Sequence, residues 1–260
     1  MKNKLIIIFS FFGINPIQFY KNMKGIGWFI RDFILLKHNL KNNKDFKISS
    51  FYPCLMDKSD AAGTNSGHYF HLDLLVAQQI YTNNPKDHID IGSRIDGFVG
   101  HVASFRKIDI IDIRELKSSQ KNFNFVKLNI CEPLKSQFIE LTDSLSCLHA
   151  IEHFGLGRYG DPIDMNAHLN AIDNFYKMLK PNGRFYFGTP IGPQRIEFNA
   201  HRVFSIKYLL EIFKDRFIIE DFYYVNDNGD LIHPEQMLQM GIENNFGCIY
   251  GCGIFFLRKI

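Results

Sequence analysis

With 260 residues, 46% hydrophobic and 22% charged, the chain has the size and composition of a globular protein with one large α/β domain or two small ones. Its formal net charge of +3 is unevenly distributed, because residues 1–47 hold nine Lys/Arg against two Asp, a net +7, which leaves −4 for the rest. A body with this acidic balance excludes broad binding of nucleic acid.

Residues 1–16 combine two lysines with about ten apolar residues, in the manner of a signal peptide. No small-x-small cleavage site follows, Asn15-Pro16 ends the run early, and the run is too short to span a bilayer. We therefore expect a terminal helix or strand that packs on the body. A basic helix lying on an anionic membrane surface is the alternative, because basic residues accompany the apolar segment 27–37.

The cysteines include no CxxC pair, which favours reduced thiols and a cytoplasmic protein; they are Cys54, Cys131, Cys147, Cys248 and Cys252. The last two lie in an apolar run near the end of the sequence. We expect them to share one face of a strand as small buried side chains, without a redox or metal role.

Residues 1–40 are predicted to form one or two helices with a break at Gly25–Gly27, and the polar segment 41–67 to form a linker. A helix is predicted over 68–81, where apolar residues recur at helical spacing. These boundaries place a basic helical extension and linker at 1–64 and the main domain at 65–260.

From residue 88 onward, predicted strands and helices alternate. The strands are 88–93, 107–114, 123–130, 144–150, 184–190, 216–225 and 247–259. The helices are 97–106, 165–180, which we expect to end at the glycine of Pro181-Asn182-Gly183, and 206–214, for which Ser205 is the expected N-cap. The alternation predicts a doubly wound, largely parallel sheet with helices on both faces.

In such a sheet a ligand binds at the carboxyl ends of the strands, near the switch in strand order. The first strand ends in Asp90-Ile91-Gly92-Ser93, where the glycine allows a sharp turn and close approach to a ligand. Alone, this is equally typical of an ordinary strand-turn-helix junction. Asp112 ends the next strand, and a carboxylate there can accept hydrogen bonds from both ribose hydroxyls of an adenosine-type ligand. Together the two ends indicate an NAD-like or S-adenosylmethionine-like ligand.

Two further strand ends carry polar side chains. Asn129 and Ile130 can bind the edge and the face of an adenine, although a polar strand end that faces water is an equal alternative. His149, Glu152 and His153 follow the fourth strand without a turn signal and are candidates for orienting a substrate or moving protons. Their H-x2-E-H spacing matches no zinc signature, and the pair at residues 68 and 71 is isolated, so we expect no metal site.

These segments together resemble the class I S-adenosylmethionine-dependent methyltransferases, which have a Rossmann-like, doubly wound, seven-stranded sheet. The resemblance covers roughly residues 65–258 and is most specific at IEH (151–153) and LKPNGR (179–184). More narrowly, the segments 67–80, 90–105 and 198–205 resemble an uncharacterised bacterial family of methyltransferase-like proteins linked to sugar and surface-polysaccharide biosynthesis.

The resemblance implies S-adenosylmethionine as the cofactor. The implied contacts are Asp90 and Gly92 with the methionine end and Asp112 with the ribose. Ile113, Asn129 and Ile130 would contact the adenine, His149 would lie beside the sulfonium, and Ser93 is a further expected cofactor contact. The sequence departs from the family at Arg94 and Asp96, where many methyltransferases have glycine. This departure leaves open a protein that binds the cofactor without catalysing.

Because a sulfonium methyl group is already activated, such an enzyme mainly aligns the acceptor, and an alcohol acceptor is helped by a general base. His153 is the first candidate for this base and His201 the second, with Glu152 orienting one of them. His68, Tyr69, Tyr159 and Asp161 lie in segments that could form the acceptor pocket.

The sequence thus predicts an O-methyltransferase for a small molecule, namely a sugar, a sugar nucleotide or another sugar-linked metabolite used for cell-surface polysaccharide. It would work in the cytoplasm or at the inner face of the membrane. The sequence predicts no oligomeric state. Methyl transfer to an N-group or a phosphate-type oxygen, and a non-catalytic binding protein, are the alternatives. An NAD-dependent dehydrogenase is disfavoured because only one mononucleotide-binding half is evident. Nucleic-acid methylation is disfavoured by the acidic body and the missing Asn/Asp-Pro-Pro-aromatic site.

Overall fold

The structure is a computed structural model that describes residues 9, 12–117, 120–234 and 238–260. Within it the chain forms two compact units, Met1–Thr64 and Asn65–Ile260. Most of the apolar run near the start of the chain, residues 1–8 and 10–11, lies outside the described residues, so the expectation of a terminal helix or strand there stays a prediction.

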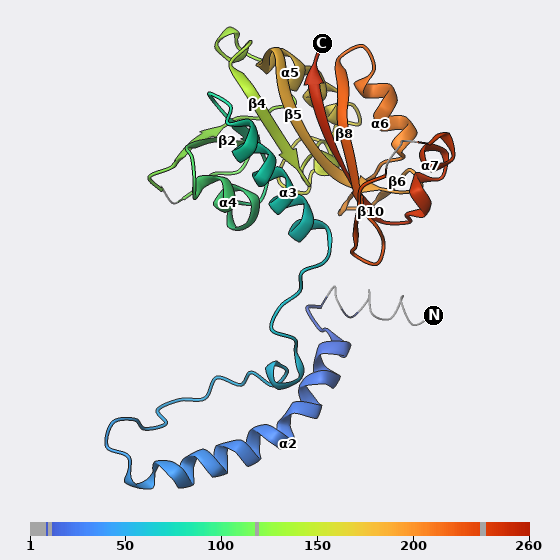
Figure 1. The fold of residues 1–260 in the computed structure, drawn as a ribbon. Coiled ribbons are helices and arrows are strands. Elements are labelled where there is room, and N and C mark those ends of the chain that lie inside the picture. The colour runs from blue at the N-terminus through green and yellow to red at the C-terminus, as the bar shows by residue number, and fades with distance from the viewer. Residues whose placement is uncertain (1–8, 10–11, 118–119, 235–237) are drawn as a thin grey trace. The chain divides into compact units, whose positions relative to one another are not determined.

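The first unit is built around one long helix, α2 (Pro16–Asn39), followed by the short 3-10 turns η1 (Leu40–Asn42) and η2 (Asp57–Ser59) (Figure 1). The side chain of Asn15 caps α2 by accepting a hydrogen bond of 3.0 Å from the amide of Gln18. The predicted break at Gly25–Gly27 is wrong, because α2 continues through both glycines. Gly25 allows the carbonyl of Leu55 to pack against the helix, where any Cβ would collide with it.

Helix α2 leaves many apolar side chains exposed, among them Ile17, Phe19, Met23, Ile30 and Ile34. Basic residues occupy its last turn at Lys37 and His38. Among the described residues, no helix has both the length and the apolar character that crossing a membrane requires.

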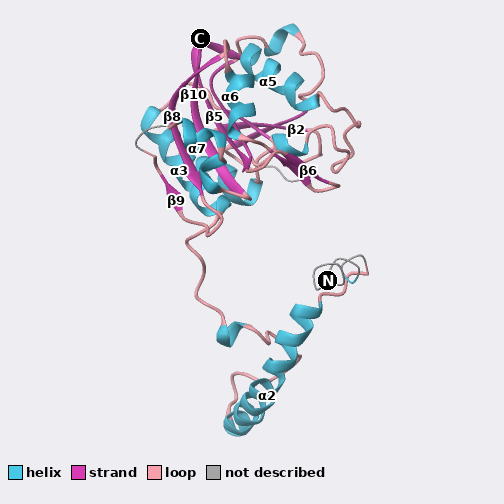
Figure 2. Cartoon of the chain, turned by 90° about the vertical axis from the view of Figure 1, so that its right-hand side faces the viewer, coloured by secondary structure: helices cyan, strands magenta, loops and turns pink. Residues whose placement is uncertain are grey.

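The second unit contains an eight-stranded sheet in the order β3-β2-β1-β4-β5-β10-β8-β9 (Figures 1 and 2). Its strands are β1 (Ile89–Ile91), β2 (Ile108–Asp112), β3 (Phe123–Lys127), β4 (Thr142–Leu148), β5 (Leu179–Ile191), β8 (Phe217–Val225), β9 (Leu231–Ile232) and β10 (Gly251–Lys259). The first five pair in parallel, and β10 inserts antiparallel between β5 and β8. The predicted doubly wound, largely parallel sheet is confirmed, and β9 adds a two-residue edge strand to the expected seven.

Helices cover both faces of this sheet. They are α3 (His68–Asn83) and α4 (Gly100–Ala103) on one face, α5 (Ala167–Met178) and α6 (Ile206–Phe213) on the other, and the short α7 (Gln239–Glu243) near the end of the chain. Alternate residues of a strand point to opposite faces. Ile110 accordingly joins the core under α3 and Ile111 the core under α5. Each such buried side chain contributes roughly 1.5–3 kcal/mol.

The remaining short elements are the π-turn η3 (Ile95–Val99), the 3-10 turns η4 (Ser136–Phe138), η5 (Ile151–His153) and η6 (Asn245–Gly247), and a hairpin of β6 (Arg195–Glu197) and β7 (His201–Val203). The helix predicted at 97–106 is therefore only the end of a π-turn followed by one turn of α-helix. Ser205 caps α6 as predicted, accepting a bond of 3.3 Å from the amide of Tyr208.

Two local predictions are wrong. The segment 181–183 does not end α5, because α5 ends at Met178 and β5 begins at the next residue. These residues instead accompany a shift in register between β4 and β5, and Asn182 has a φ of 60°. Cys248 precedes β10, so it shares no strand face with Cys252, although both side chains are buried.

Candidate functional site

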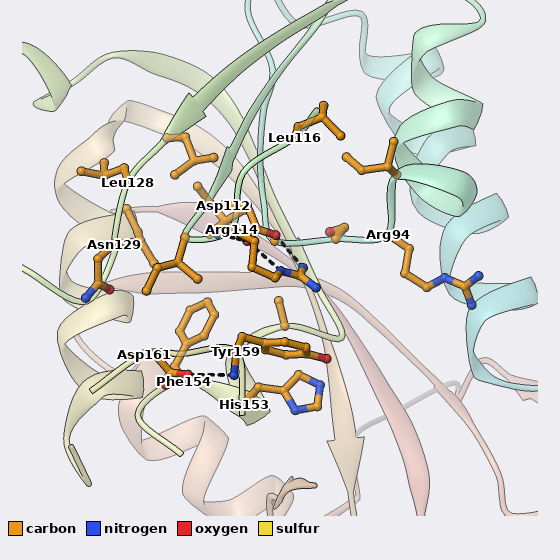
Figure 3. Close-up of a pocket in the computed structure, with 18 of the residues that line it drawn as sticks. Arg94, Asp112, Arg114, Leu116, Leu128, Asn129, His153, Phe154, Tyr159 and Asp161 are labelled. Carbon is orange, nitrogen blue, oxygen red and sulfur yellow. Dashed lines mark hydrogen bonds and ion pairs between the residues drawn. The ribbon is translucent and has the colours of Figure 1, made fainter. Parts of the chain in front are cut away.

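The order of strands reverses at β1, which lies between β2 and β4. The carboxyl ends of these strands and of β3 border a cavity of about 560 Å³ (Figure 3). Its lining includes seven of the eight residues predicted to contact a cofactor, namely Gly92, Ser93, Asp112, Ile113, Asn129, Ile130 and His149. Ligands of doubly wound sheets bind at this position.

The turn after β1 depends on a glycine. Gly92 has a φ of +70°, its amide donates to the carbonyl of Ile111 at 2.9 Å, and a Cβ on it would lie 3.0 Å from Cβ of Ala150. A larger residue would therefore be strained and would narrow the approach to the cavity.

Asp90, the eighth predicted contact, does not line the cavity. It is fully buried, and its Oδ1 accepts hydrogen bonds of 2.6 Å from both the Ser93 and Ser146 hydroxyls, while Oδ2 accepts one of 3.0 Å from the Ser93 amide. Burial raises the pKa of Asp90 to about 6, and these hydrogen bonds oppose the rise. We therefore assign Asp90 to holding the loop that contains Gly92.

The two residues that depart from the methyltransferase pattern bind each other. Arg94 and Asp96 form a paired contact with N–O distances of 3.1 and 3.0 Å, and the guanidinium lies over the ring of Tyr69 at 5.0 Å from its centre. Both line the cavity, and Arg94 extends away from Asp112 (Figure 3). The departure from glycine thus adds an exposed charge pair to the lining of the cavity.

Asp112 sits at the end of β2 with both carboxylate oxygens engaged. Oδ1 accepts from the amide and Nε of Arg114 at 2.8 and 3.0 Å, and Oδ2 accepts from Nη2 at 2.7 Å (Figure 3). The guanidinium also lies 4.4 Å from the centre of the Tyr159 ring. A ribose bound by Asp112 would replace the side-chain bonds of Arg114.

The wall expected to hold an adenine is apolar at Ile113 and Ile130, of which the second is buried. The amide of Asn129 is engaged locally, because its Oδ1 accepts from the Cys131 amide at 3.1 Å and its Nδ2 donates to Glu132 at 3.0 Å. Asn129 therefore shapes a turn beside the cavity and has one further lone pair to offer an adenine edge.

A second cavity, of about 390 Å³, is lined by polar side chains: His68, Tyr69, His149, Glu152, His153, Arg158, Tyr159, His201 and Tyr250. Four of these residues, Tyr69, His149, His153 and Tyr159, also line the first cavity. All three predicted catalytic residues, Glu152, His153 and His201, line this second cavity. Asp161 lines only the first, and its carboxylate accepts from loop amides, including that of Gly155 at 2.7 Å.

The ring of His153 is held in one tautomer. Its Nδ1 lies 2.7 Å from the carbonyl of Ala200, which can only accept, so Nδ1 carries the proton and Nε2 a lone pair. Burial lowers the pKa of His153, and Arg158 and His201 act in the same direction while Glu152 opposes them. The neutral imidazole is therefore the prevailing form near neutral pH.

Glu152 orients His149, whereas the sequence predicted that it orients His153 or His201. Its buried carboxylate lies 3.0 Å from Nδ1 of His149 and 3.9 Å from Nε2 of His153, and it accepts a bond of 3.3 Å from the Thr189 hydroxyl. Burial lowers the pKa of His149, but the adjacent Cys252 and Glu152 raise it well above its ordinary value. His149 has a φ of +51°, and its buried Nε2 makes no short hydrogen bond in the described part of the chain, where Cys252 is the side chain beside it.

His201 lies on β7, with its Nε2 3.6 Å from Glu197 and its ring centre 6.2 Å from that of His153. Arg158 and Tyr250 also line this cavity, and neither was predicted as a site residue. Arg158 lies in a glycine-rich loop that follows the fourth strand, and this position could have marked it as a site residue. Tyr250 lies in an apolar run of the sequence, and nothing in that run indicated a site.

A family described as "Caenorhabditis protein of unknown function, DUF268" matches residues 103–228, just under half of the chain. No curated protein matches the sequence. The narrower bacterial family linked to polysaccharide biosynthesis therefore stays a prediction.

The fold is similar to that of solved structures. The Burkholderia thailandensis 1,6-didemethyltoxoflavin-N1-methyltransferase, crystallised with its named substrate and S-adenosylhomocysteine, has 13% identity, with 95% of this chain and 91% of that chain covered and a TM-score of 0.52. The [4+2]-cyclase SpnF has 13% identity, with 73% and 80% covered and a TM-score of 0.51. These likenesses show a Rossmann-like methyltransferase fold. A fold alone does not determine the reaction, as the cyclase illustrates.

Proposed function

We propose that this protein is an S-adenosylmethionine-dependent O-methyltransferase that acts on a hydroxyl group of a sugar or sugar-linked metabolite. The main support for this proposal is that the first and second cavities adjoin at His149 and His153. The first cavity has an apolar wall and a carboxylate, and the second, which we call the acceptor cavity, is lined by imidazoles, phenols and charged groups. Such a pair suits a nucleoside cofactor beside a polar acceptor.

The residues of the first cavity fit the cofactor. Gly92 provides a turn that a Cβ would obstruct, Asp112 offers a carboxylate for the ribose hydroxyls, and Ile113 and Ile130 offer apolar faces for the adenine. Asn129 would contribute its remaining lone pair, and Ser93 borders the turn. The cofactor supplies a methyl group that is already activated as a sulfonium.

In the proposed reaction His153 is the general base. His153 lines the second cavity, and its Nε2 lone pair would take the proton of the attacking hydroxyl, since Nδ1 is committed to Ala200. His201 is the second candidate for the base, and the 6.2 Å between the two ring centres places both within one acceptor pocket. Glu152 would position His149 beside the reacting centre.

A sugar acceptor is supported by the polar lining and size of the second cavity. A volume of about 390 Å³ suits a small ligand. Imidazole, phenol, carboxylate and guanidinium groups offer both donors and acceptors to several hydroxyls. The role in surface-polysaccharide biosynthesis rests on the narrower sequence resemblance. Arg158 favours a phosphate-bearing acceptor such as a sugar nucleotide, and for the same reason a phosphate-type oxygen is the second candidate.

The proposed setting is the cytoplasm, with contact at the inner membrane face through the N-terminal unit. Exposed apolar side chains such as Phe19 and Ile34 lie on a helix that also carries Lys21, Lys24 and Arg31, a combination that suits an anionic lipid surface.

Calorimetry with S-adenosylmethionine and S-adenosylhomocysteine tests the cofactor. Binding of at least one at micromolar concentration is expected, and no heat at high micromolar concentration from either would overturn the proposal. Mass spectrometry of reactions with sugar nucleotides then tests the acceptor, where a product heavier by one methylene supports it. Binding without any product favours the non-catalytic alternative.

A further inference from the structure

Three side chains from distant parts of the sequence converge beside the acceptor cavity: His68 from the start of α3, His149 after β4, and Cys252 from β10. We propose that these residues form a binding site for a divalent transition-metal ion of the zinc type. The site stands on its own geometry, and only its role in activating an acceptor rests on the proposed function.

The donor atoms are close enough to share one ion. One ligand atom from each of the three residues lies within 4.8 Å of the others. Tetrahedral zinc, with bonds of about 2.0–2.3 Å, separates its ligand atoms by roughly 3.5 Å, so a closure of about 1 Å completes the set. The rings of His68 and His149 stack beside each other, with an interplanar angle of 4° and 5.3 Å between their centres.

His149 has the surroundings of a metal ligand. Glu152 binds its Nδ1 at 3.0 Å, and this carboxylate is itself held by the Thr189 hydroxyl. Metal-binding histidines are typically oriented in this way, with the second nitrogen left for the metal. The Nε2 of His149 is buried and makes no short hydrogen bond among the described residues, and the group beside it that acts on this imidazole is the thiol of Cys252. The residue also adopts a left-handed φ of +51° that places its ring there.

The ligand set indicates which ion would bind. Two imidazoles and a thiolate suit zinc and related transition metals, whereas magnesium and calcium prefer oxygen ligands. Three protein ligands leave a fourth position open, as in catalytic zinc sites. Because His68 and His149 line the acceptor cavity, the open position would be reached from it.

This placement suggests a role in the proposed reaction. The thiolate of Cys252 would offset one of the two positive charges of the metal ion. This would limit the repulsion between the ion and the nearby sulfonium. A hydroxyl polarised by the ion would lose its proton to Nε2 of His153 more readily. The new O–C bond forms as the sulfonium S–C bond breaks, and the electron pair of that bond returns to sulfur.

The test is a titration of the chelator-treated full chain with Co²⁺, which reports a bound thiolate through a charge-transfer absorption band. The wild type is expected to show this band at one equivalent, and Zn²⁺ should abolish it by displacement. Cys252→Ser should eliminate the band, and His68→Ala should weaken binding at least 100-fold. Glu152→Gln should weaken it roughly 10- to 100-fold, as expected for a residue that orients a ligand.

His71→Ala and Cys248→Ser are the matched controls, since these residues lie near the three ligands in sequence but outside the cluster. Both should keep the band unchanged. Absence of the band in the wild type, or its persistence in Cys252→Ser, would overturn the site, and the wild-type result does not depend on any variant folding. Cofactor calorimetry on the same metal-free protein tests the methyltransferase proposal separately, so the two can fail independently.

Discussion

Asp112 and Arg114 are joined by a two-pronged ion pair, with Nη2 of the arginine 2.7 Å from Oδ2 of the aspartate and Nε 3.0 Å from Oδ1. The carboxylate proposed to hold the ribose is therefore already bound to a guanidinium of its own chain. Ribose hydroxyls would have to compete with that guanidinium, and substitutions of the two partners should act in opposite directions.

Asp112→Asn should weaken binding of S-adenosylhomocysteine roughly 10- to 100-fold, because a hydrogen bond to a charged group contributes about 1.5–3 kcal/mol. Calorimetry measures the effect. Asp109→Asn is the control, since Asp109 lies on the same strand, bonds to Asn124 at 2.8 Å and does not line the cavity. An equal loss of affinity in both variants would contradict the role of Asp112.

Arg114→Met should strengthen binding of S-adenosylhomocysteine by up to about fivefold. A half-exposed ion pair contributes up to about 1 kcal/mol, and this variant releases the carboxylate while keeping an aliphatic side chain. Arg195→Met, which breaks a surface pair with Glu197, should change nothing. Weaker binding in Arg114→Met would instead show that the guanidinium contacts the cofactor.

Gly92→Ala should lower both stability and cofactor affinity. A left-handed φ costs an alanine about 1–2 kcal/mol, and the added methyl group would press against Ala150. Gly160→Ala separates the two effects, because Gly160 has a φ of +83° with nothing within 4 Å of a Cβ. Both variants should unfold at lower denaturant concentration, and only Gly92→Ala should lose affinity. Unchanged affinity there would remove Gly92 from the cofactor site.

His153→Asn should leave S-adenosylhomocysteine binding unchanged and reduce kcat by roughly 10²- to 10⁴-fold, the usual contribution of a general base. Measurement of both quantities on the same preparation separates binding from catalysis. His201→Asn is the matched comparison, because its ring lines the same cavity. If only His201→Asn reduces kcat, the base is His201.

The activity of the wild type should also decline toward low pH. Burial, Arg158 and His201 lower the pKa of His153 while Glu152 raises it, and Tyr159 packs on the same ring. A lowered pKa keeps the base unprotonated at neutral pH, so kcat should fall only below the ordinary histidine pKa of about 6.5. Arg158→Gln removes a positive charge that lowers the pKa of His153. The acid limb of the pH profile should therefore shift to higher pH in this variant. A shift downward would exclude His153 as the titrating group.

Local patterns in the sequence were sufficient for much of this fold. Apolar runs that alternate with amphipathic segments predicted the strands and helices of the main domain, because a side chain's burial follows the period of its own element. Predictions of local structure were poorer where packing against segments remote in the sequence determines the conformation. Gly25 lies inside helix α2, where its missing Cβ leaves room for the carbonyl of Leu55, and Pro181–Gly183 accompany a register shift in β5 because β4 pairs beside them.

The sequence by itself determined which polar residues end strands, and so it predicted that Gly92, Asp112 and His149 would lie together at the edge of one sheet. Only the tertiary structure decided their partners. It placed Asp90 beneath the loop, paired Glu152 with His149 in place of His153 or His201, and brought Cys252 beside His68. The order of strands in the sheet brings remote segments of the sequence together. Local periodicity does not determine that order, so contacts among such segments are seen only in the folded chain.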